Sequence, residues 1–341
     1  MAPSAPSDPP PARPPSVDLS KPGIALALGS GMARGFAHIG ALRALERHGI
    51  KPTIVAGCSI GAVVGGCYLA GRMDEFEEWC LSLNRRRIFH YLDFRVRSAG
   101  LIGGSKLFSL MEHYFADMKM EDLPHPFVTI AADLTTGHEV WLRRGSFIDC
   151  VRASFALPGV FPPVEVNGRR LVDGALVNPL PVSPCQALGA QLTIAIDLNG
   201  DLIGKAVRPG QTYQTIAGFD IFDDKDVEPE DQKTFFSSAL SKRIFRRDED
   251  APSLFGVMVS SLNIIQDRLT RSRLAGDPPD VHIKPRIGHI GALEFERSRE
   301  LIEEGEAAVE RAMPEIKAAA EIFLPRNEPS KDSSSSDIKK S

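Results

Sequence analysis

Residues 23–35 read Gly-Ile-Ala-Leu-Ala-Leu-Gly-Ser-Gly-Met-Ala-Arg-Gly, and this stretch decides the fold. The apolar run Gly23–Leu28 ends in glycines, which is the pattern of a strand buried in a parallel sheet. Apolar residues at helical spacing in Phe36–His48 then predict a helix, which Gly49 ends. A strand that passes through a tight glycine-rich loop into a helix is the first unit of an α/β fold.

The chain downstream repeats this order of strand and helix. Thr53–Ala56 predicts a second strand and Gly61–Leu69 a helix of small residues. Further strands are predicted over Phe127–Ala132, Glu139–Leu142, Arg169–Val172, Leu192–Asp197 and Val281–Lys284. Further helices are predicted over Asp74–Leu83, Lys106–Phe115, Phe147–Ala156, Leu254–Arg273 and Phe295–Ala320, the last interrupted at Pro314. We therefore expect an α/β fold, with a parallel-type central sheet flanked by helices.

The composition excludes several classes of protein. The chain has 341 residues, 43% of them hydrophobic, and a net charge of −4, as expected for a globular protein with a sizeable core. A chain with so balanced a charge creates no overall positive potential that would attract nucleic acid, and we expect no nucleic-acid partner. The five cysteines are odd in number and lack CxxC spacing, which disfavours disulfides and zinc and suits a reducing compartment. We expect no metal.

Three segments depart from this composition. Residues 1–20 are rich in proline and residues 325–341 in serine and lysine, so we expect disordered ends around a domain spanning 21–324. Residues from about 199 to 252 carry an acidic run and then a basic run, which predicts a charged insertion. The uncharged stretch Pro52–Gly71 holds five glycines and no aromatic belt, so we predict no transmembrane segment there. The first residues lack the pattern of a secretory signal, and we expect a cytoplasmic protein.

The sequence Gly57-Cys58-Ser59-Ile60-Gly61 is a G-x-S-x-G motif between a predicted strand and a predicted helix. On such a turn the serine hydroxyl projects from the carboxyl edge of the sheet. The residues two before and two after it must be small, because larger ones would collide with the neighbouring strand and helix. This context predicts Ser59 as a nucleophile. The alternative is a tight turn that only joins two closely packed elements.

The glycine-rich loop that follows the first strand offers backbone N–H groups to an anion. Such groups can bind the pyrophosphate of a nucleotide or the oxyanion of an attacked ester. The spacing G-x-G-x-x-x-G is one residue longer than the dinucleotide fingerprint, and no acidic residue ends the second strand. An oxyanion hole therefore agrees with the sequence better than a nucleotide-binding site does. Its expected members are Gly29, Ser30, Gly31, Met32, Ala33, Arg34, Gly35 and Ile60.

The sequence Leu171-Val172-Asp173-Gly174-Ala175 places an aspartate at the end of a predicted strand. Asp173 can point into the same crevice as Ser59 and act on its proton, although most Asp-Gly pairs are ordinary turns. The usual base for a serine is histidine. Ser59, Asp173 and either His282 or His289 would follow the chain order of a Ser–Asp–His hydrolase. Both readings stay open on the residues alone.

Taken together, these motifs resemble the patatin-like phospholipase family. The segments Gly29–Leu42, Ser154–Pro163 (SFALPGVFPP) and Ile283–Phe295 (IKPRIGHIGALEF) are similar to parts of its bacterial members, and the resemblance extends from about Gly23 to Ala320 outside the insertion. It implies a patatin-like architecture and a dyad of Ser59 and Asp173. The motif glycines Gly57, Gly61 and Gly174 and the adjacent Ala175 frame that dyad, and the glycine-rich loop supplies the oxyanion hole with Arg34 beside it. Ser30 and the longer spacing depart from the all-glycine form of the loop.

The resemblance implies a lipid acyl hydrolase of the phospholipase A or lysophospholipase kind. Such an enzyme cleaves fatty-acyl esters through an acyl-Ser59 intermediate, with Asp173 as general base and without a cofactor. The alternatives are a Ser-His-Asp esterase, and a phosphate- or nucleotide-binding module that uses Gly29–Gly35 without hydrolysis. The basic and aromatic stretch at Arg85–Arg87 suits anionic lipid headgroups, or a solvated loop whose aromatic residues pack inward. We expect a lipid ester substrate and transient contact with the inner face of a membrane.

Overall fold

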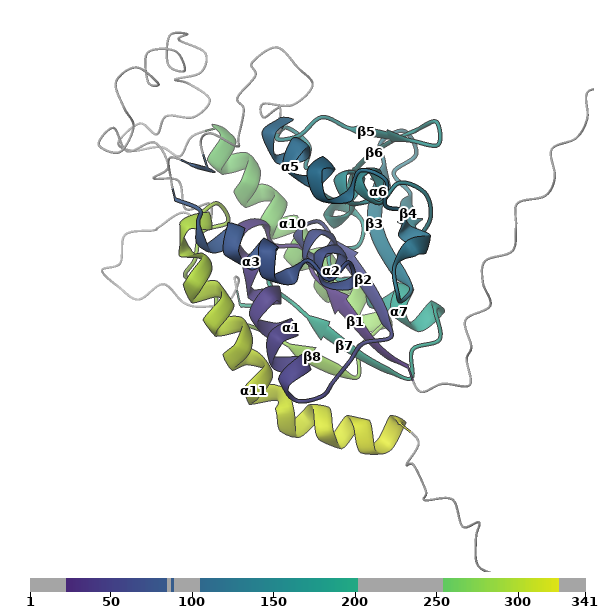
Figure 1. Ribbon diagram of the computed structural model, residues 1–341, viewed down its shortest axis with the longest axis vertical. Helices are drawn as coiled ribbons and strands as arrows, with labels where there is room; N and C mark the ends of the chain where they lie inside the picture. The colour runs from purple at the N-terminus through teal and green to yellow at the C-terminus, as the bar shows by residue number, and fades with distance from the viewer. Residues whose placement is uncertain (1–22, 85–86, 89–104, 202–253, 325–341) are drawn as a thin grey trace, which may run out of the picture.

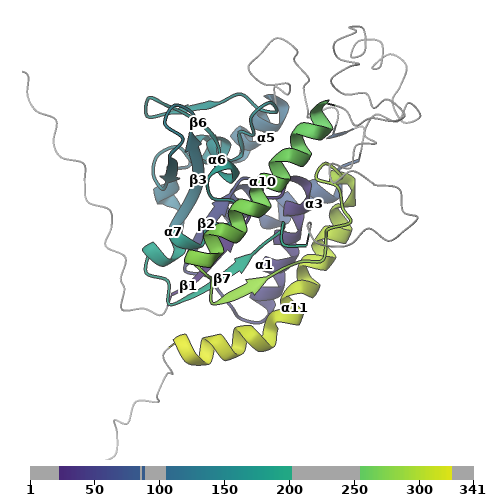
Figure 2. The same cartoon turned by 180° about the vertical axis from the view of Figure 1, so that it is seen from behind.

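The computed structural model describes residues 23–84, 87–88, 105–201 and 254–324. In this part of the chain, eight strands form one sheet with helices on both of its faces (Figures 1 and 2). The predicted arm, the predicted tail, the insertion from residue 202 onward and Arg85 and Arg86 lie outside the described residues.

The centre of the sheet consists of short, buried, parallel strands. They are β1 (Ile24–Leu28), β2 (Ile54–Cys58), β3 (Phe127–Asp133), β7 (Leu192–Ile196) and β8 (Val281–Ile283), side by side in the order β3-β2-β1-β7-β8. This confirms the predicted α/β fold. The chain winds outward from β1 in one direction and later continues on its other side. The carboxyl ends of β1 and its neighbours are therefore the edge at which open α/β sheets bind ligands.

The remaining strands run antiparallel to their neighbours, so the sheet is mixed rather than wholly parallel. They are β4 (Glu139–Leu142), β5 (Val164–Val166) and β6 (Arg169–Asp173). The sequence did not predict β5, which has only three residues. Strand β4 occupies one edge of β3. On the opposite edge, Ile130 of β3 pairs with Cys58 of β2, and the next residue, Ala131, pairs with Asp173 of β6. Strands β2 and β6 therefore meet end to end along β3.

Alternate residues of the strands pack against two helical layers. Leu26 and Leu28 of β1 belong to one hydrophobic core, and Ala25 and Ala27 belong to the other. Figure 1 shows α1 and α3 in front of the sheet, and Figure 2 shows α10 crossing its opposite face. The helices are α1 (Ala37–Arg47), α2 (Ile60–Leu69), α3 (Met73–Leu81), α5 (Ser105–Phe115), α6 (Phe147–Phe155), α7 (Val182–Ala187), α10 (Leu254–Gly276) and α11 (Ser298–Phe323). Among the described residues, none of the helices combines the length and hydropathy needed to cross a membrane.

Helices α1 and α11 cross closely because each has a glycine at the crossing. A Cβ added to Gly40 would lie 1.8 Å from the carbonyl oxygen of Ile302, and one added to Gly305 would lie 1.9 Å from that of Ala37. The predicted interruption at Pro314 is wrong, because α11 is continuous through this residue. The helix is instead bent (Figure 1), as expected where a proline removes an N–H donor and crowds the carbonyl four residues earlier.

Candidate active site

Ser59 occupies a strained turn between β2 and α2. Its φ of 55° and ψ of −121° are rare for a residue with a side chain. The flanking glycines make the turn possible. A Cβ on Gly57 would lie 2.7 Å from the backbone nitrogen of Ala62, and a Cβ on Gly61 would lie 2.2 Å from the carbonyl oxygen of Leu28. Neither flanking position has room for a larger side chain, as the sequence predicted.

A second serine holds the turn from outside the motif. The backbone N–H of Ser59 donates to Oγ of Ser154, which lies in α6 and is wholly buried, at 3.0 Å. This bond engages the N–H of Ser59 and ties the strained residue to the helix behind it. Ser154 begins the segment Ser154–Pro163 that resembles the patatin-like family, but the sequence alone did not indicate this contact.

The end-to-end meeting of β2 and β6 brings Ser59 and Asp173 together. Oγ of Ser59 donates to Oδ2 of Asp173 at 2.7 Å, and the backbone N–H of Ala175 donates to Oδ1 at 2.8 Å. Gly174 allows this approach, since a Cβ there would lie 2.2 Å from the carbonyl oxygen of Ile130. The two predicted residues are therefore in direct contact, although 114 positions separate them.

Burial sets the protonation behaviour of this carboxyl group. Asp173 is 2% exposed, and its desolvation raises the pKa to about 7, against the opposing effect of the hydrogen bonds from Ala175 and Ser59. Near neutral pH the carboxylate and the carboxylic acid are therefore both accessible. A group with this pKa can accept a proton and return it within one reaction cycle.

The glycine-rich loop lies beside this pair, and most of its N–H groups are already engaged. Those of Gly29, Ser30, Ala33 and Arg34 donate to the carbonyl oxygens of Ile196, Pro179, Ala292 and Gly31. Gly35 lies inside the 3-10 helix η1 (Met32–Phe36), where a Cβ would lie 2.0 Å from Cγ1 of Ile60. This close approach packs η1 against the residue that follows Ser59. Of the eight expected donors, only Gly31, Met32 and Ile60 keep an N–H group without an acceptor among the described residues.

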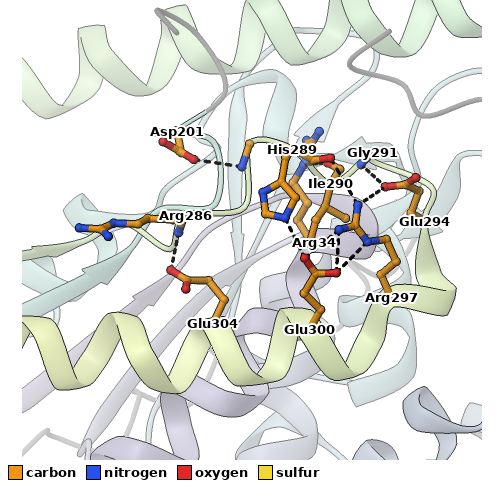
Figure 3. Close-up of polar contacts among 11 residues, drawn as sticks. Arg34, Asp201, Arg286, His289, Ile290, Gly291, Glu294, Arg297, Glu300 and Glu304 are labelled. Atoms are coloured by element: carbon orange, nitrogen blue, oxygen red, sulfur yellow. Dashed lines mark hydrogen bonds and ion pairs between the residues drawn. The ribbon is translucent and has the colours of Figure 1, made fainter. Parts of the chain in front are cut away.

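The side chain of Arg34 joins the loop to a segment that is distant in the sequence. Its guanidinium is fully buried, and Nε donates to the carbonyl oxygen of Ile290 at 2.7 Å (Figure 3). Burial lowers the pKa of Arg34 to about 10, opposed by the charge of Glu294, so the group remains a cation at neutral pH. The role of Arg34 beside the oxyanion site stays a prediction, and its side chain contacts the segment Ile283–Phe295.

That segment is itself held by a network of charged groups, as Figure 3 shows. Glu294 accepts from the backbone N–H of Gly291 at 2.7 Å and pairs with Arg297 at 3.1 Å. Arg297 also pairs with Glu300 at 2.7 Å, and Glu300 accepts from Nε2 of His289 at 2.8 Å. The network therefore holds in place the segment whose carbonyl groups accept hydrogen bonds from Ala33 and Arg34.

Three further buried residues contact the start of the loop. Nε2 of His38 lies 2.8 Å from the carbonyl oxygen of Gly29. Burial lowers the pKa of His38 to about 4, so the ring is neutral and donates through Nε2. Oγ of Ser30 donates to Oε1 of Gln266 in α10 at 3.3 Å, and Nδ2 of Asn199 donates to the carbonyl oxygen of Ser30 at 3.3 Å. A glycine in place of Ser30 would lack the contact with α10.

The two histidines considered as a base lie in other ion pairs. Nε2 of His282 lies 3.1 Å from Oδ2 of Asp197, and Nε2 of His289 contacts Glu300. The hydroxyl of Ser59 already donates directly to Asp173, which leaves no place for an imidazole between them. Within the described residues, no group of three or more His, Cys, Asp or Glu side chains is arranged to hold a metal ion.

An apolar cavity of about 230 Å³ opens at the Ser59–Asp173 pair. Both residues line it, together with Met32 and Ile60, whose N–H groups are free of other acceptors. The rest of its wall is almost entirely aliphatic and aromatic, and comes mainly from α2, α3, α5 and α6 and from the stretch after α6. The site therefore combines an activated hydroxyl, free N–H groups and an apolar chamber at the carboxyl edge of the sheet.

Comparison with known proteins identifies the family. The model of the patatin-like phospholipase family matches residues 26–185. An NTE family protein of Mycobacterium bovis, Mb1092c, is 36% identical over 331 residues, which is 86% of this chain and 92% of that protein. Patatin-like phospholipase domain-containing protein 6 of Homo sapiens is 35% identical over 182 residues, 51% of this chain and 13% of that protein. The neuropathy target esterase sws of Drosophila melanogaster is 34% identical over 182 residues, 51% of this chain and 13% of that protein.

The mixed α/β sheet flanked by helices and these matches define a protein of the lipid hydrolase class. The chain belongs to the patatin-like phospholipase family. The resemblance that the motifs indicated is therefore confirmed.

Proposed function

We propose that this protein hydrolyses fatty-acyl carboxylic esters, with Ser59 as the nucleophile and Asp173 as the general base. The observation that carries the proposal is the 2.7 Å hydrogen bond from Oγ of Ser59 to Oδ2 of Asp173 at the mouth of an apolar cavity. A hydroxyl that donates to a buried carboxylate is ready to lose its proton as it attacks. The adjoining chamber takes an acyl chain out of water.

The reaction has two halves that use the same groups. Oγ of Ser59 forms a bond to the ester carbonyl carbon while its proton passes to Asp173. The leaving alkoxide then takes that proton as its bond to the carbonyl carbon breaks, which leaves acyl-Ser59. A water molecule next attacks the acyl carbon and gives a proton to Asp173, and the proton returns to Oγ of Ser59 as the fatty acid leaves. The pKa of about 7 for Asp173 suits both directions of transfer.

The negative charge on the carbonyl oxygen requires donors aimed at it. We assign this role to the backbone N–H groups of Gly31, Met32 and Ile60. The other candidate groups are bonded elsewhere or, for Gly35, lie in the interior of η1, whereas Met32 is the first residue of η1. Donors of this kind contribute about 2.7–4 kcal/mol each when they are held in place before the reaction. The bonds from Ser30, Ala33 and Arg34 to the surrounding segments supply that rigidity.

The substrate class follows from the cavity and from the family. An apolar chamber beside the dyad fits one fatty-acyl chain of a phospholipid or lysophospholipid, and the polar headgroup remains outside. We propose that the enzyme is cytoplasmic and reaches its substrate by transient contact with a membrane surface. Sedimentation with anionic phospholipid vesicles tests this contact. No binding at low ionic strength would refute it.

The decisive experiment is Ser59→Ala, assayed with phospholipid, lysophospholipid and p-nitrophenyl esters and with a fluorophosphonate probe. We expect loss of hydrolysis by at least about 10³-fold and loss of labelling, because the nucleophile is gone. Ser261→Ala, at an exposed serine of α10, is the matched control and should keep both. Labelling or hydrolysis within a few-fold of the wild type in Ser59→Ala would overturn the proposal.

A further inference from the structure

Helix α2 forms a continuous wall of the cavity that begins at the nucleophile. Ser59 immediately precedes the helix, and Ile60, Val63 and Cys67 all line the chamber. Their spacing of three and four residues places them on one face of the helix. The path along this face therefore starts at the reacting hydroxyl and runs away from it along the helix axis.

The length of this path corresponds to an acyl chain of intermediate length. The eight residue-to-residue steps from Ser59 to Cys67 rise about 12 Å along the helix. An extended chain with C–C bonds of about 1.5 Å advances about 1.25 Å per carbon, so about ten carbons span this distance. Val63 lies about 6 Å from Ser59 on the same measure, beside about the fifth carbon.

The end of the path is marked by a change from apolar to charged lining. The backbone N–H of Arg72 donates to the carbonyl oxygen of Cys67 at 2.9 Å, so Arg72 lies directly at the end of α2. Its side chain pairs with Glu75 at 2.8 Å, and both residues line the cavity. A methyl terminus that reached this pair would gain no further apolar contact, because it would displace water from charged groups.

The width of the chamber suits a single chain. Its volume of about 230 Å³ is below the ~300–1,000 Å³ of pockets that hold drug-sized ligands. Phe147 closes against α2 because the facing helix residue is a glycine. A Cβ on Gly66 would lie 2.6 Å from Cζ of this ring. Burial raises the pKa of the Cys67 thiol to about 12, so this side chain stays neutral and acts as an apolar part of the wall.

We propose that the Ile60–Val63–Cys67 face of α2 measures the length of the acyl chain. The cavity then holds one chain at a time, and the protein prefers acyl groups of about ten carbons. Val63 is the specificity-determining residue at the middle of the path, and the Arg72–Glu75 pair is the stop at its end. This inference rests on the proposed function, because it takes Ser59 as the point where the acyl carbon is attached.

The first test measures kcat/KM for p-nitrophenyl esters from two to sixteen carbons. In the wild type we expect a rise of at most about fourfold per added methylene up to about ten carbons, followed by a plateau or decline. In Val63→Phe, the new ring fills the path at its middle, and the decanoate-to-butyrate ratio should fall at least about tenfold. Val257→Phe makes the same change at an exposed site of α10 and should leave this ratio unaltered. An unaltered ratio in Val63→Phe, or a wild-type profile without a break, would overturn the inference.

The second test does not depend on turnover. Calorimetric titration of Ser59→Ala with fatty acids of four to sixteen carbons should show affinity that stops rising at about ten carbons. The double variant with Val63→Phe should show the break near five carbons. If the wild type hydrolyses no ester and the breaks are still seen, the proposed function fails and the measuring role of α2 stands. If esters are hydrolysed and the affinities show no break, the measuring role fails alone.

Discussion

At Ser59 and Asp173 the chain maintains two unfavourable features next to each other. One is a side chain at positive φ, and the other is a carboxyl group removed from water. Each costs on the order of 1–3 kcal/mol or more in isolation. The bond to Ser154 and the close approaches at Gly57, Gly61 and Gly174 hold them in place. The rigid surroundings thus position the groups that the proposed chemistry needs.

The raised pKa of Asp173 predicts a pH profile for hydrolysis. The carboxylate must be deprotonated to accept the serine proton, so kcat/KM for a short ester should fall about tenfold per pH unit below pH 7. It should be level between pH 8 and 9. His282→Gln and His289→Gln should keep this profile, because these rings contact Asp197 and Glu300 instead of Ser59. If the fall of kcat/KM below pH 7 disappeared in either histidine variant, that histidine would belong to a triad.

Among the elements, the α1–α11 crossing illustrates a case in which packing outweighs helix propensity. In an open helix interior, Gly→Ala is stabilising by about 1 kcal/mol. At Gly305 the added methyl would meet the carbonyl oxygen of Ala37 at 1.9 Å, and the helices would have to move apart. Helix α11 also contacts η1, so the separation would extend to the glycine-rich loop.

We therefore predict that Gly305→Ala destabilises the fold by about 1–3 kcal/mol, the usual cost of overpacking. The measurement is urea unfolding, read as a lower midpoint at unchanged slope. Gly276→Ala, at the end of α10 where a Cβ would meet nothing within 4 Å, serves as the control and should be neutral or mildly stabilising. An equal or higher midpoint for Gly305→Ala would show that the crossing relaxes without cost.

On the scale of the whole molecule, the candidate site lies where the parallel and antiparallel parts of the sheet join. Strands β2 and β6 end against each other on one edge of β3, and the glycine-rich loop follows the adjacent β1. Three segments distant in sequence therefore converge on one edge. The burial of Asp173 is a consequence of this convergence, and it links the site to the stability of the whole fold.

The linkage predicts that Asp173→Asn is more stable than the wild type at alkaline pH. The folded-state pKa of about 7 is above the usual value near 3.8, so the stability contributed by this group is complete below pH 3.8. It is lost as the pH rises from about 4 to 7, because the carboxyl group of the unfolded chain ionises over this range while the buried one keeps its proton. Asparagine avoids that loss.

The Tm difference between Asp173→Asn and the wild type should grow over this range and level off above pH 7, at a few degrees in favour of the variant. Differential scanning calorimetry at several pH values measures it. The variant should also lose about 10²–10⁴-fold in kcat, as expected when a general base is removed. A constant Tm difference from pH 4 to 8 would contradict the raised pKa.

The local features of this protein could be predicted from the sequence because they depend on short-range sterics. Apolar runs ending in glycine predicted the parallel strands and the loops that follow them. The turn at Ser59 could be recognised because only small residues at positions 57 and 61 allow the backbone approaches that the structure contains. The Asp-Gly-Ala stretch was a candidate because it places Asp173 at the end of a predicted strand, and in the structure a Cβ on the neighbouring Gly174 would lie 2.2 Å from the carbonyl oxygen of Ile130.

The tertiary structure alone decided which of these candidates meet. Asp173 reaches Ser59 because β6 runs antiparallel to β3 along the part of the shared edge that lies beyond the end of β2, and strand direction is not contained in an apolar pattern. The same holds for His282 and His289, whose partners Asp197 and Glu300 come from other segments. The sequence predicted eight oxyanion-hole residues, but three of their N–H groups donate to the distant carbonyl groups of Ile196, Pro179 and Ala292, and only three keep a free N–H group within the described part of the chain. Local sterics are encoded residue by residue, whereas the choice of hydrogen-bond partner depends on the whole packed chain.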